Sequence, residues 1–164
     1  MTAGAERPVG ARGRFMERRF SPRGIGRVAL GVFLLVAGIS HWTLLRRSFQ
    51  AQVPPWLPFD PDFVVLASGV VEMLLGLGLL AVSFGPFRRF RVLPGWLAAL
   101  FFVAVFPGNI SQFVAQMEAG GAASAVPLMV RLLFQPLLVA WALWSTAAWA
   151  WLRWRWKHRG ASAV

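Results

Sequence analysis

The sequence predicts an all-α integral membrane protein, a bundle of four transmembrane helices with both termini in the cytoplasm. Three observations predict this fold class. The chain of 164 residues is 57% hydrophobic and 14% charged, whereas about a quarter of the residues in a soluble domain are charged. Four apolar stretches are each long enough to cross a bilayer, which takes about 20 helical residues. Basic residues gather at the ends of these stretches.

A basic tail and a first span open the chain. Residues 1–23 are rich in Arg, Gly and Pro and show no sustained apolar period, so we expect a disordered cytoplasmic tail. The first span is predicted at about residues 24–45. A signal peptide is the alternative interpretation, because a basic segment precedes an apolar one. The full spanning length, with no A-x-A cleavage site after it, favours a retained helix.

Three further spans and a second basic tail follow. Asp60 and Pro61 suit the N-cap and the first turn of the second span. Pro107 lies inside the third span and leaves one backbone carbonyl without its helical donor, so we expect a kink or a break there. Pro136 is expected to act in the same way in the fourth span. These spans and the tail are predicted at about residues 63–84, 93–116, 127–152 and 153–164.

The basic residues predict the orientation. Fourteen of the seventeen Lys and Arg residues fall in the segment through Arg27, in the loop between the second and third spans, or at the C-terminus, while the expected loop at 118–126 has none. Cytoplasmic segments of membrane proteins are enriched in such residues, so both termini are predicted to be cytoplasmic. The net charge of +11 favours anionic lipid head groups as partners. Nucleic acid is not expected, because the arginines form no groove with aromatic platforms.

Every span carries polar residues that lipid would not tolerate unpaired. A helix rises about 1.5 Å per residue through a hydrocarbon core of about 30 Å. If the spans thread the bilayer alternately, these residues all fall in the outer half of the membrane. Buried polar groups in a membrane mark functional sites by default. The candidate pocket residues are His41, Glu72, Asn109, Gln112, Arg131 and Gln135.

A direct charge pair between Glu72 and Arg131 is the centre of this predicted site, and the other polar residues complete a hydrogen-bonded pocket. Small residues beside the cluster permit helices to approach closely: Gly69 shares a helix face with Glu72, and Gly38 shares one with His41. The alternative interpretation is a structural lock, a buried pair that fixes the helix register and binds nothing.

The outer loop between the first two spans is a candidate lid. Its sequence at 53–61, VPPWLPFDP, is too rich in proline for a helix and too apolar for an open linker. We expect it to lie along the outer interface over the polar cluster, with Pro54, Pro55 and Trp56 as lid residues. A tight structural connector is the alternative.

Several cofactor chemistries are not expected on this chain. It has no cysteine, which excludes a dithiol relay, a thiolate zinc site and a cysteine-bound iron–sulfur cluster. A bis-histidine haem is not expected, because the only other histidine is His158, in the cytoplasmic tail. A metal site would lack hard ligands, because Glu72 is the only carboxylate expected within a span. We therefore do not expect a complete enzyme from this chain alone.

Short motifs along residues 24–149 carry a family resemblance. They are GISHW (38–42), VPPWLP (53–58), SGVVE (68–72), GLGLL (76–80), VFPGNI (105–110), RLLFQP (131–136) and WALW (141–144). In this order and spacing the chain resembles the DoxX-like family of small four-helix bacterial membrane proteins. It departs from the expected pattern at Gly108, where alanine is expected, and at Phe134, where leucine is expected. Neither change removes a polar residue of the cluster.

The resemblance implies a protein of the bacterial cytoplasmic membrane that is a subunit or accessory of a redox system. The outer pocket would then bind a quinone or a similar lipid-soluble molecule, and the partners would be a redox enzyme or further copies of the chain. Two other hypotheses stay open. The bundle could carry a small amphiphile or a proton without electron transfer, or it could be an assembly protein whose polar cluster only fixes its fold.

Overall fold

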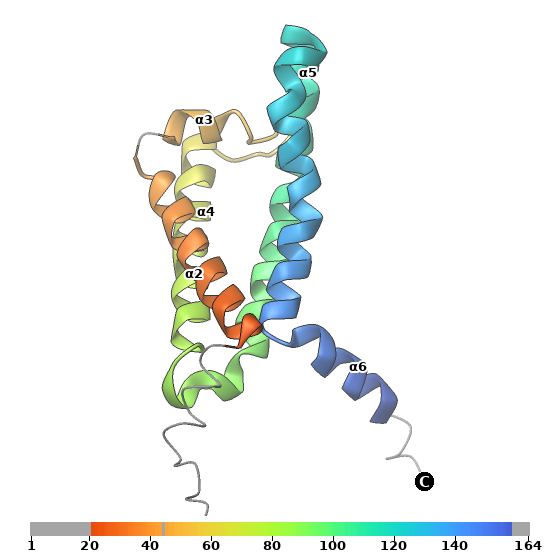
Figure 1. The fold of residues 1–164 in the computed structure, drawn as a ribbon. Coiled ribbons are helices and arrows are strands. Elements are labelled where there is room, and N and C mark those ends of the chain that lie inside the picture. The colour runs from red at the N-terminus through yellow and green to blue at the C-terminus, as the bar shows by residue number, and fades with distance from the viewer. Residues whose placement is uncertain (1–20, 44, 159–164) are drawn as a thin grey trace, which may run out of the picture.

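The computed structural model describes residues 21–43 and 45–158 of the chain. These residues form helices and turns with no strand among them, which confirms the predicted all-helical class. The expected N-terminal tail lies outside the described residues, apart from its last three positions. In chain order the elements are α2 (Pro22–Ser40), α3 (Arg46–Gln50), α4 (Pro61–Ala81), the 3₁₀ helix η1 (Gly85–Phe90), α5 (Val92–Ser145) and α6 (Ala148–His158) (Figure 1).

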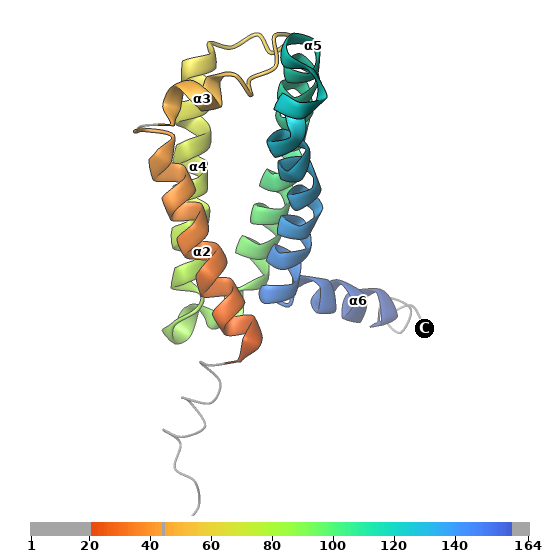
Figure 2. The ribbon, with the colours of Figure 1, turned by 45° about the horizontal axis from the view of Figure 1, so that its top comes forward.

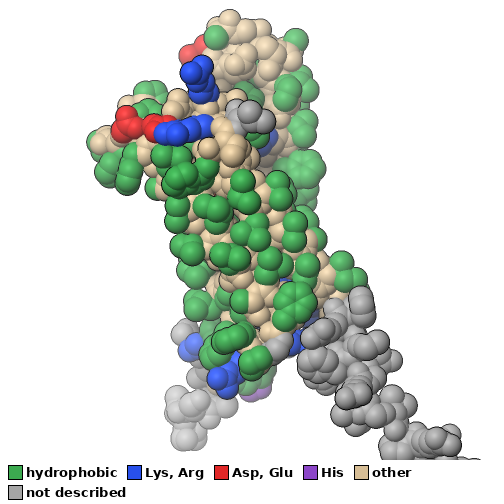
Figure 3. Space-filling view, turned by 90° about the vertical axis from the view of Figure 1, so that its left-hand side faces the viewer, with side chains coloured by type: hydrophobic (Ala, Val, Ile, Leu, Met, Phe, Trp, Pro, Cys, Tyr) green, Lys and Arg blue, Asp and Glu red, His purple; other side chains and the backbone are tan. Residues whose placement is uncertain are grey.

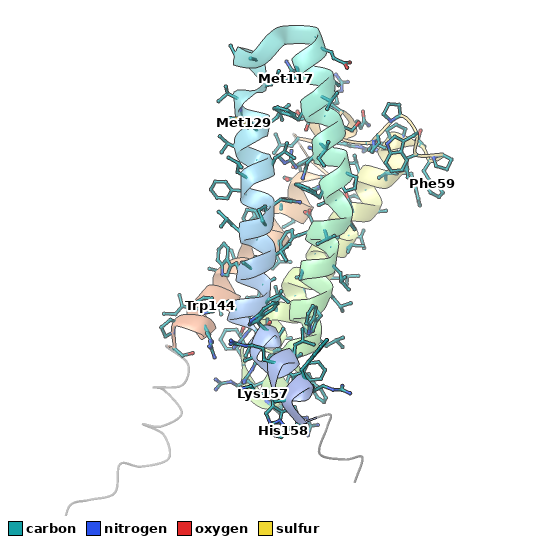
Figure 4. All side chains as sticks on the ribbon, turned by 90° about the vertical axis from the view of Figure 1, so that its right-hand side faces the viewer. Phe59, Met117, Met129, Trp144, Lys157 and His158 are labelled. Carbon is teal, nitrogen blue, oxygen red and sulfur yellow. The ribbon has the colours of Figure 1, made fainter. Side chains whose placement is uncertain are left out.

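Three of these helices, α2, α4 and α5, are long and apolar enough to cross a membrane. α2 and α4 have 19 and 21 residues, close to the length of one crossing. α5 has 54 residues and contains Gly121, with a φ of 74° and a ψ of 179°. Glycine adopts this conformation because it has no Cβ. The helix turns back there, and its two arms, 92–120 and 122–145, run side by side (Figures 2 and 4).

The predicted loop at 118–126 is therefore wrong, because helix continues on both sides of Gly121. The alanines around this glycine favour helix up to the turn itself. Met117 and Met129 lie on opposite arms close to the turn (Figure 4). Gly121, with its positive φ, thus makes the reversal of chain direction that was predicted for a nine-residue loop.

The ends of the first and fourth spans also differ from the prediction. α2 ends at Ser40, and His41 is its C-cap. The second arm of α5 ends at Ser145, where the sequence analysis extended the span to residue 152. Ala147 has a φ of 59°, and after it α6 leaves in a new direction (Figure 2). Hydropathy could not locate this break, because the sequence stays rich in Ala and Trp across it.

α5 is not broken at Pro107 or Pro136, where the sequence predicts a kink or a break. Within α5, which the structure describes throughout, Gly121 is the residue with non-helical backbone angles. A proline removes one hydrogen bond from its helix, and neighbouring segments at membrane depth can stabilise the freed groups. Gln135 Nε2 donates a hydrogen bond to the carbonyl of Phe102 at 3.0 Å, one residue before the carbonyl that Pro107 leaves free.

The start of α4 follows the prediction. Asp60 is the N-cap, and its Oδ1 accepts hydrogen bonds from the backbone nitrogens of Asp62 at 2.9 Å and Phe63 at 3.0 Å. Pro61 occupies the first turn, where its missing N–H costs no helical hydrogen bond.

Asp60→Ala is expected to lower the free energy of unfolding by about 1 kcal/mol, the usual loss when an N-cap side chain is removed. Thermal unfolding in detergent, followed by circular dichroism, measures the change. Asp60→Asn is the matched control and should keep most of the stability, because an amide oxygen also caps. Equal losses in both variants would contradict the capping role.

α2 and α4 pack along each other, and the arms of α5 close the other side of the core. This core contains Leu30, Leu34, Leu79, Ala98, Ala99, Phe102 and Ala142. On the face shown in Figure 3, hydrophobic side chains gather between two charged ends. Such a band is what lipid would cover.

A buried arginine joins the helices at the end of the molecule where α2 begins. Arg27 is 4% exposed. Its Nε donates to Ser83 Oγ at 2.9 Å, and its Nη1 donates to the carbonyl of Ser145 at 3.2 Å. In the sequence Arg27 belongs to the basic segment, and no pattern around it predicts this role. The contacts tie α2 to the residues that follow α4 and to the end of α5.

Candidate functional site

Two adjoining cavities lie between the α2–α4 pair and the arms of α5, towards the end opposite α6. Their volumes are about 590 Å³ and about 210 Å³. The larger is bounded by α2, α4, both arms of α5 and Phe49 of α3. The smaller lies under the loop that joins α3 to α4. Both share the same wall residues, His41, Phe49, Glu72, Val105 and Arg131.

Five of the six predicted pocket residues line the larger cavity: His41, Glu72, Asn109, Arg131 and Gln135. The sixth, Gln112, lines neither cavity. Its Oε1 is buried and has no hydrogen-bond partner among the described residues. Residues from three separate helices thus meet in one place, as the depth of each along its helix suggested.

The predicted direct ion pair between Glu72 and Arg131 is wrong. The basic group closest to the carboxylate is His41, whose Nδ1 lies 3.4 Å from Glu72 Oε2. Arg131 Nη2 donates instead to Gln52 Oε1 at 2.7 Å. Glu72 and Arg131 still line the same two cavities.

The physical reason for this difference lies in Phe49 of α3 and Gln52 of the loop that follows it. Phe49 stacks on the ring of His41, with the ring centroids 3.9 Å apart and the planes 3° from parallel. The Arg131 guanidinium lies 5.9 Å from the centroid of Phe49, within the range of a cation–π contact. Phe49 and Gln52 therefore hold Arg131 at the outer wall. No periodic signal in the sequence could have placed these two residues in the site.

His41 is fixed by the end of α2. Its Nδ1 lies 2.8 Å from the carbonyl of Ala37, and because a carbonyl only accepts, Nδ1 carries the hydrogen in this contact. The side chain is 8% exposed, and that of Glu72 is 13% exposed. Glu72 Oε2 is buried and has no hydrogen-bond donor among the described residues. A buried carboxyl oxygen without a donor is costly, which makes it a natural place for a ligand donor.

The predicted lid residues differ among themselves. Pro54 is buried, and Trp56 is 68% exposed; both line the smaller cavity. Pro55 is exposed. The loop approaches α5 at Gly108, where an added Cβ would lie 2.7 Å from the carbonyl oxygen of Gln52. The loop therefore closes the outer end of the site against α5.

A second polar contact stabilises the outer rim. Arg46 of α3 makes a bidentate salt bridge to Asp62 of α4, and Gln50 Nε2 donates to Asp62 Oδ1 at 2.8 Å. The hydrogen bond to this carboxylate raises the pKa of Arg46 above its ordinary value. The rim thus holds α3, and with it Phe49, over the cavities.

The chemistry of the larger cavity suits an apolar molecule with a few polar atoms. Its volume falls in the range of about 300–1,000 Å³ that is typical of small-molecule pockets. Aromatic walls include Phe101, Phe102, Phe134 and Trp141. Arg131 supplies donors, and Glu72 supplies an acceptor or, when protonated, a donor.

These features define a helical protein with three helices long and apolar enough to span a membrane, and with a largely apolar cavity that carries a few polar side chains. The chain belongs to the family described as a domain of unknown function, DUF8561, whose model matches residues 30–146. This range contains all of the candidate pocket and lid residues. No curated protein and no solved structure matches the chain.

Proposed function

We propose that the protein is a membrane subunit or accessory of a redox system that binds a quinone-like, lipid-soluble molecule in the larger cavity. One observation carries the proposal. Glu72 and Arg131 line the same cavity without a direct ion pair, so each keeps polar groups for a third molecule. If Glu72 and Arg131 only stabilised the fold, they would instead bond directly to each other.

Each of the cavity side chains has a separate role that follows from its chemistry. The guanidinium of Arg131 has five N–H donors, of which one bonds to Gln52, and another can donate to a ligand carbonyl. Glu72 can accept a hydrogen bond from a ligand hydroxyl. His41 lies beside Glu72, and because its Nδ1 hydrogen is held by the carbonyl of Ala37, Nε2 is the nitrogen that can gain or release a proton. The aromatic walls would contact a flat ring on its faces.

The proposed topology has four passes, with both termini in the cytoplasm of a bacterial inner membrane. α2 and α4 would each cross once, and the two arms of α5 would each cross once. The arginines of η1, α6 and the first turns of α2 lie at one end of the molecule. Because cytoplasmic segments are enriched in basic residues, this end would face the cytoplasm. The cavities then lie in the outer half. The same proposal includes the membership of the chain in a DoxX-like group, which the resemblance of its short motifs supports.

Extraction of the bound ligand tests the function. The full chain would be purified in mild detergent from a membrane that contains quinone, and organic extracts would be analysed by mass spectrometry. We expect co-purified quinone in the unaltered protein. Glu72→Gln and Arg131→Ala should lower its retention by roughly 10- to 100-fold, because a hydrogen bond to a charged group contributes about 1.5–3 kcal/mol.

Two controls keep this result interpretable. Glu118→Gln and Arg47→Ala make the same chemical changes at exposed positions outside both cavities, and they should retain the ligand. Gln52→Ala breaks the hydrogen bond to Arg131 but keeps its charge, and should lower retention less than Arg131→Ala. Protein that carries no quinone, or an equal loss in the controls, would overturn the proposal.

An assembly role is the second candidate. The contacts from Arg131 to Gln52 and from Phe49 to His41 tie the outer loop to the helices, which a purely structural cluster would also do. In that case Glu72→Gln and Arg131→Ala would reduce thermal stability, while a stable complex with a redox enzyme or with further copies would persist. Solute or proton flux in liposomes would instead support a carrier.

A further inference from the structure

Arginine side chains gather at the end of the molecule where α6 lies, far from the cavities described above. Figure 4 places Lys157 and His158 there, remote from Phe59 and Met117. The four carboxylates among the described residues, Asp60, Asp62, Glu72 and Glu118, all lie on other parts of the helices. Arg23 and Arg153 therefore place positive charge at this end, away from the described carboxylates.

A groove with two different ends lies between α6 and the second arm of α5. Its volume is about 410 Å³. Arg23 of α2 and Arg153 of α6 line one part, together with Trp149. Pro136, Val139 and Leu143 line another part, along about 10 Å of the arm. The groove thus combines a cationic mouth with an apolar channel that rises towards the middle of the helix.

A second cavity adjoins this groove. It has a volume of about 340 Å³ and is lined by Trp151 and by the three arginines of η1 and its C-cap, Arg88, Arg89 and Arg91. Ala147 and Ala150 line both the groove and this cavity. The left-handed backbone of Ala147, with a φ of 59°, turns α6 away from α5 and so opens both spaces.

We propose that the groove binds an anionic phospholipid, with the phosphate between Arg23 and Arg153 and one acyl chain along Pro136, Val139 and Leu143. The charge of the mouth requires a negative head group, and the apolar channel requires a hydrocarbon chain. Basic pockets between transmembrane helices are known to take anionic head groups, and tryptophans favour the interface between head groups and chains. This inference is independent of the outer cavity and its ligand.

Native mass spectrometry of the full chain tests the proposal. The protein would be released from micelles that hold equal amounts of phosphatidylglycerol and phosphatidylcholine with identical chains, and the retained lipid counted. We expect phosphatidylglycerol to be retained preferentially. The double variant Arg23→Ala/Arg153→Ala should lower that preference by roughly tenfold or more, because each arginine near an anionic surface contributes about a factor of five.

A matched variant on the same helix distinguishes binding in the groove from general attraction of anionic lipid to a basic helix. Arg155→Ala/Lys157→Ala removes two positive charges from α6, but neither residue lines the groove or the second cavity. It should leave the preference unchanged. An equal fall in both double variants, or an unchanged preference in Arg23→Ala/Arg153→Ala, would overturn the proposal.

A third variant tests the acyl channel without any change of charge. Ala140 is exposed and lines the groove, so Ala140→Phe fills the channel while both arginines stay. Retention of phosphatidylglycerol should fall at least severalfold, with thermal stability unchanged. Undiminished retention would show that no chain occupies the groove and would overturn this part of the proposal.

Discussion

Gly69→Val is expected to prevent α2 and α4 from packing, with a loss of about 3 kcal/mol or more in the free energy of unfolding. A Cβ added at Gly69 would lie 2.9 Å from the carbonyl oxygen of Gly38 and 2.7 Å from the Cβ of His41. The reverse contact is equally close, because a Cβ at Gly38 would lie 2.6 Å from the carbonyl oxygen of Gly69. Backbone atoms on both sides cannot move aside as a flexible side chain could. The helices would have to separate.

The effect should extend to the candidate site. The contact at Gly69 is what lets His41 lie against α4, where its Nδ1 comes within 3.4 Å of Glu72 Oε2. If the proposed function is right, Gly69→Ala, a milder change, should lower ligand retention together with stability. Thermal unfolding in detergent and ligand extraction from the same preparations measure the two effects.

Gly78→Ala provides the matched control on the same helix. A Cβ there would lie 3.9 Å from atoms of Pro94, an ordinary van der Waals distance. Alanine is also the better helix former by about 0.5–1 kcal/mol, so Gly78→Ala should be neutral or slightly stabilising. If Gly69→Ala changed the free energy of unfolding as little as Gly78→Ala, the close packing of α2 on α4 would be contradicted.

The elements that the sequence predicted well depend on local chemistry. The apolar stretches identified helices of spanning length, and Asp60 with Pro61 marked where α4 begins, because a cap acts over three residues. The small residues Gly38 and Gly69 indicated a close helix contact, since glycines on facing stripes have few other uses in lipid. In each case the signal itself lies within a few turns of one helix.

The errors concern positions that depend on distant parts of the chain. Hydropathy does not report backbone angles, so it cannot reveal the positive φ of Gly121 and Ala147. The turn within α5 and the start of α6 were therefore predicted at the wrong positions. Proline inside a span predicts a kink or a break, but α5 runs unbroken through Pro107.

The candidate site shows the same division between local and distant information. Depth along each helix was enough to predict that five of the six polar residues line one cavity. It could not show that Glu72 lies beside His41, because the partner of Arg131 is set by α3 and its loop. Phe49 and Gln52 reach the site only through the fold of that loop, which has no periodic pattern to read.

Gly95→Ala should disrupt the contact that closes the two arms of α5 at the basic end. A Cβ on Gly95 would lie 2.6 Å from the Cβ of Thr146 and 2.8 Å from its Cγ2. Thr146 is fully buried, and its hydroxyl donates to the carbonyl of Ala142 at 2.7 Å, so it cannot rotate away without losing that bond. We expect a loss of about 2 kcal/mol or more in the free energy of unfolding.

The exchange variant Gly95→Ala/Thr146→Gly tests the contact itself. Thr146→Gly alone should cost about 1 kcal/mol through its lost hydrogen bond, but in the double variant it makes room for the new Cβ. The double variant should therefore be more stable than the sum of the single losses predicts, by about 0.5–3 kcal/mol, the range of coupling between residues in contact. Thermal unfolding of the four proteins gives this coupling energy. Additive losses would mean that the start and the end of α5 do not touch, and that the helix does not turn back at Gly121.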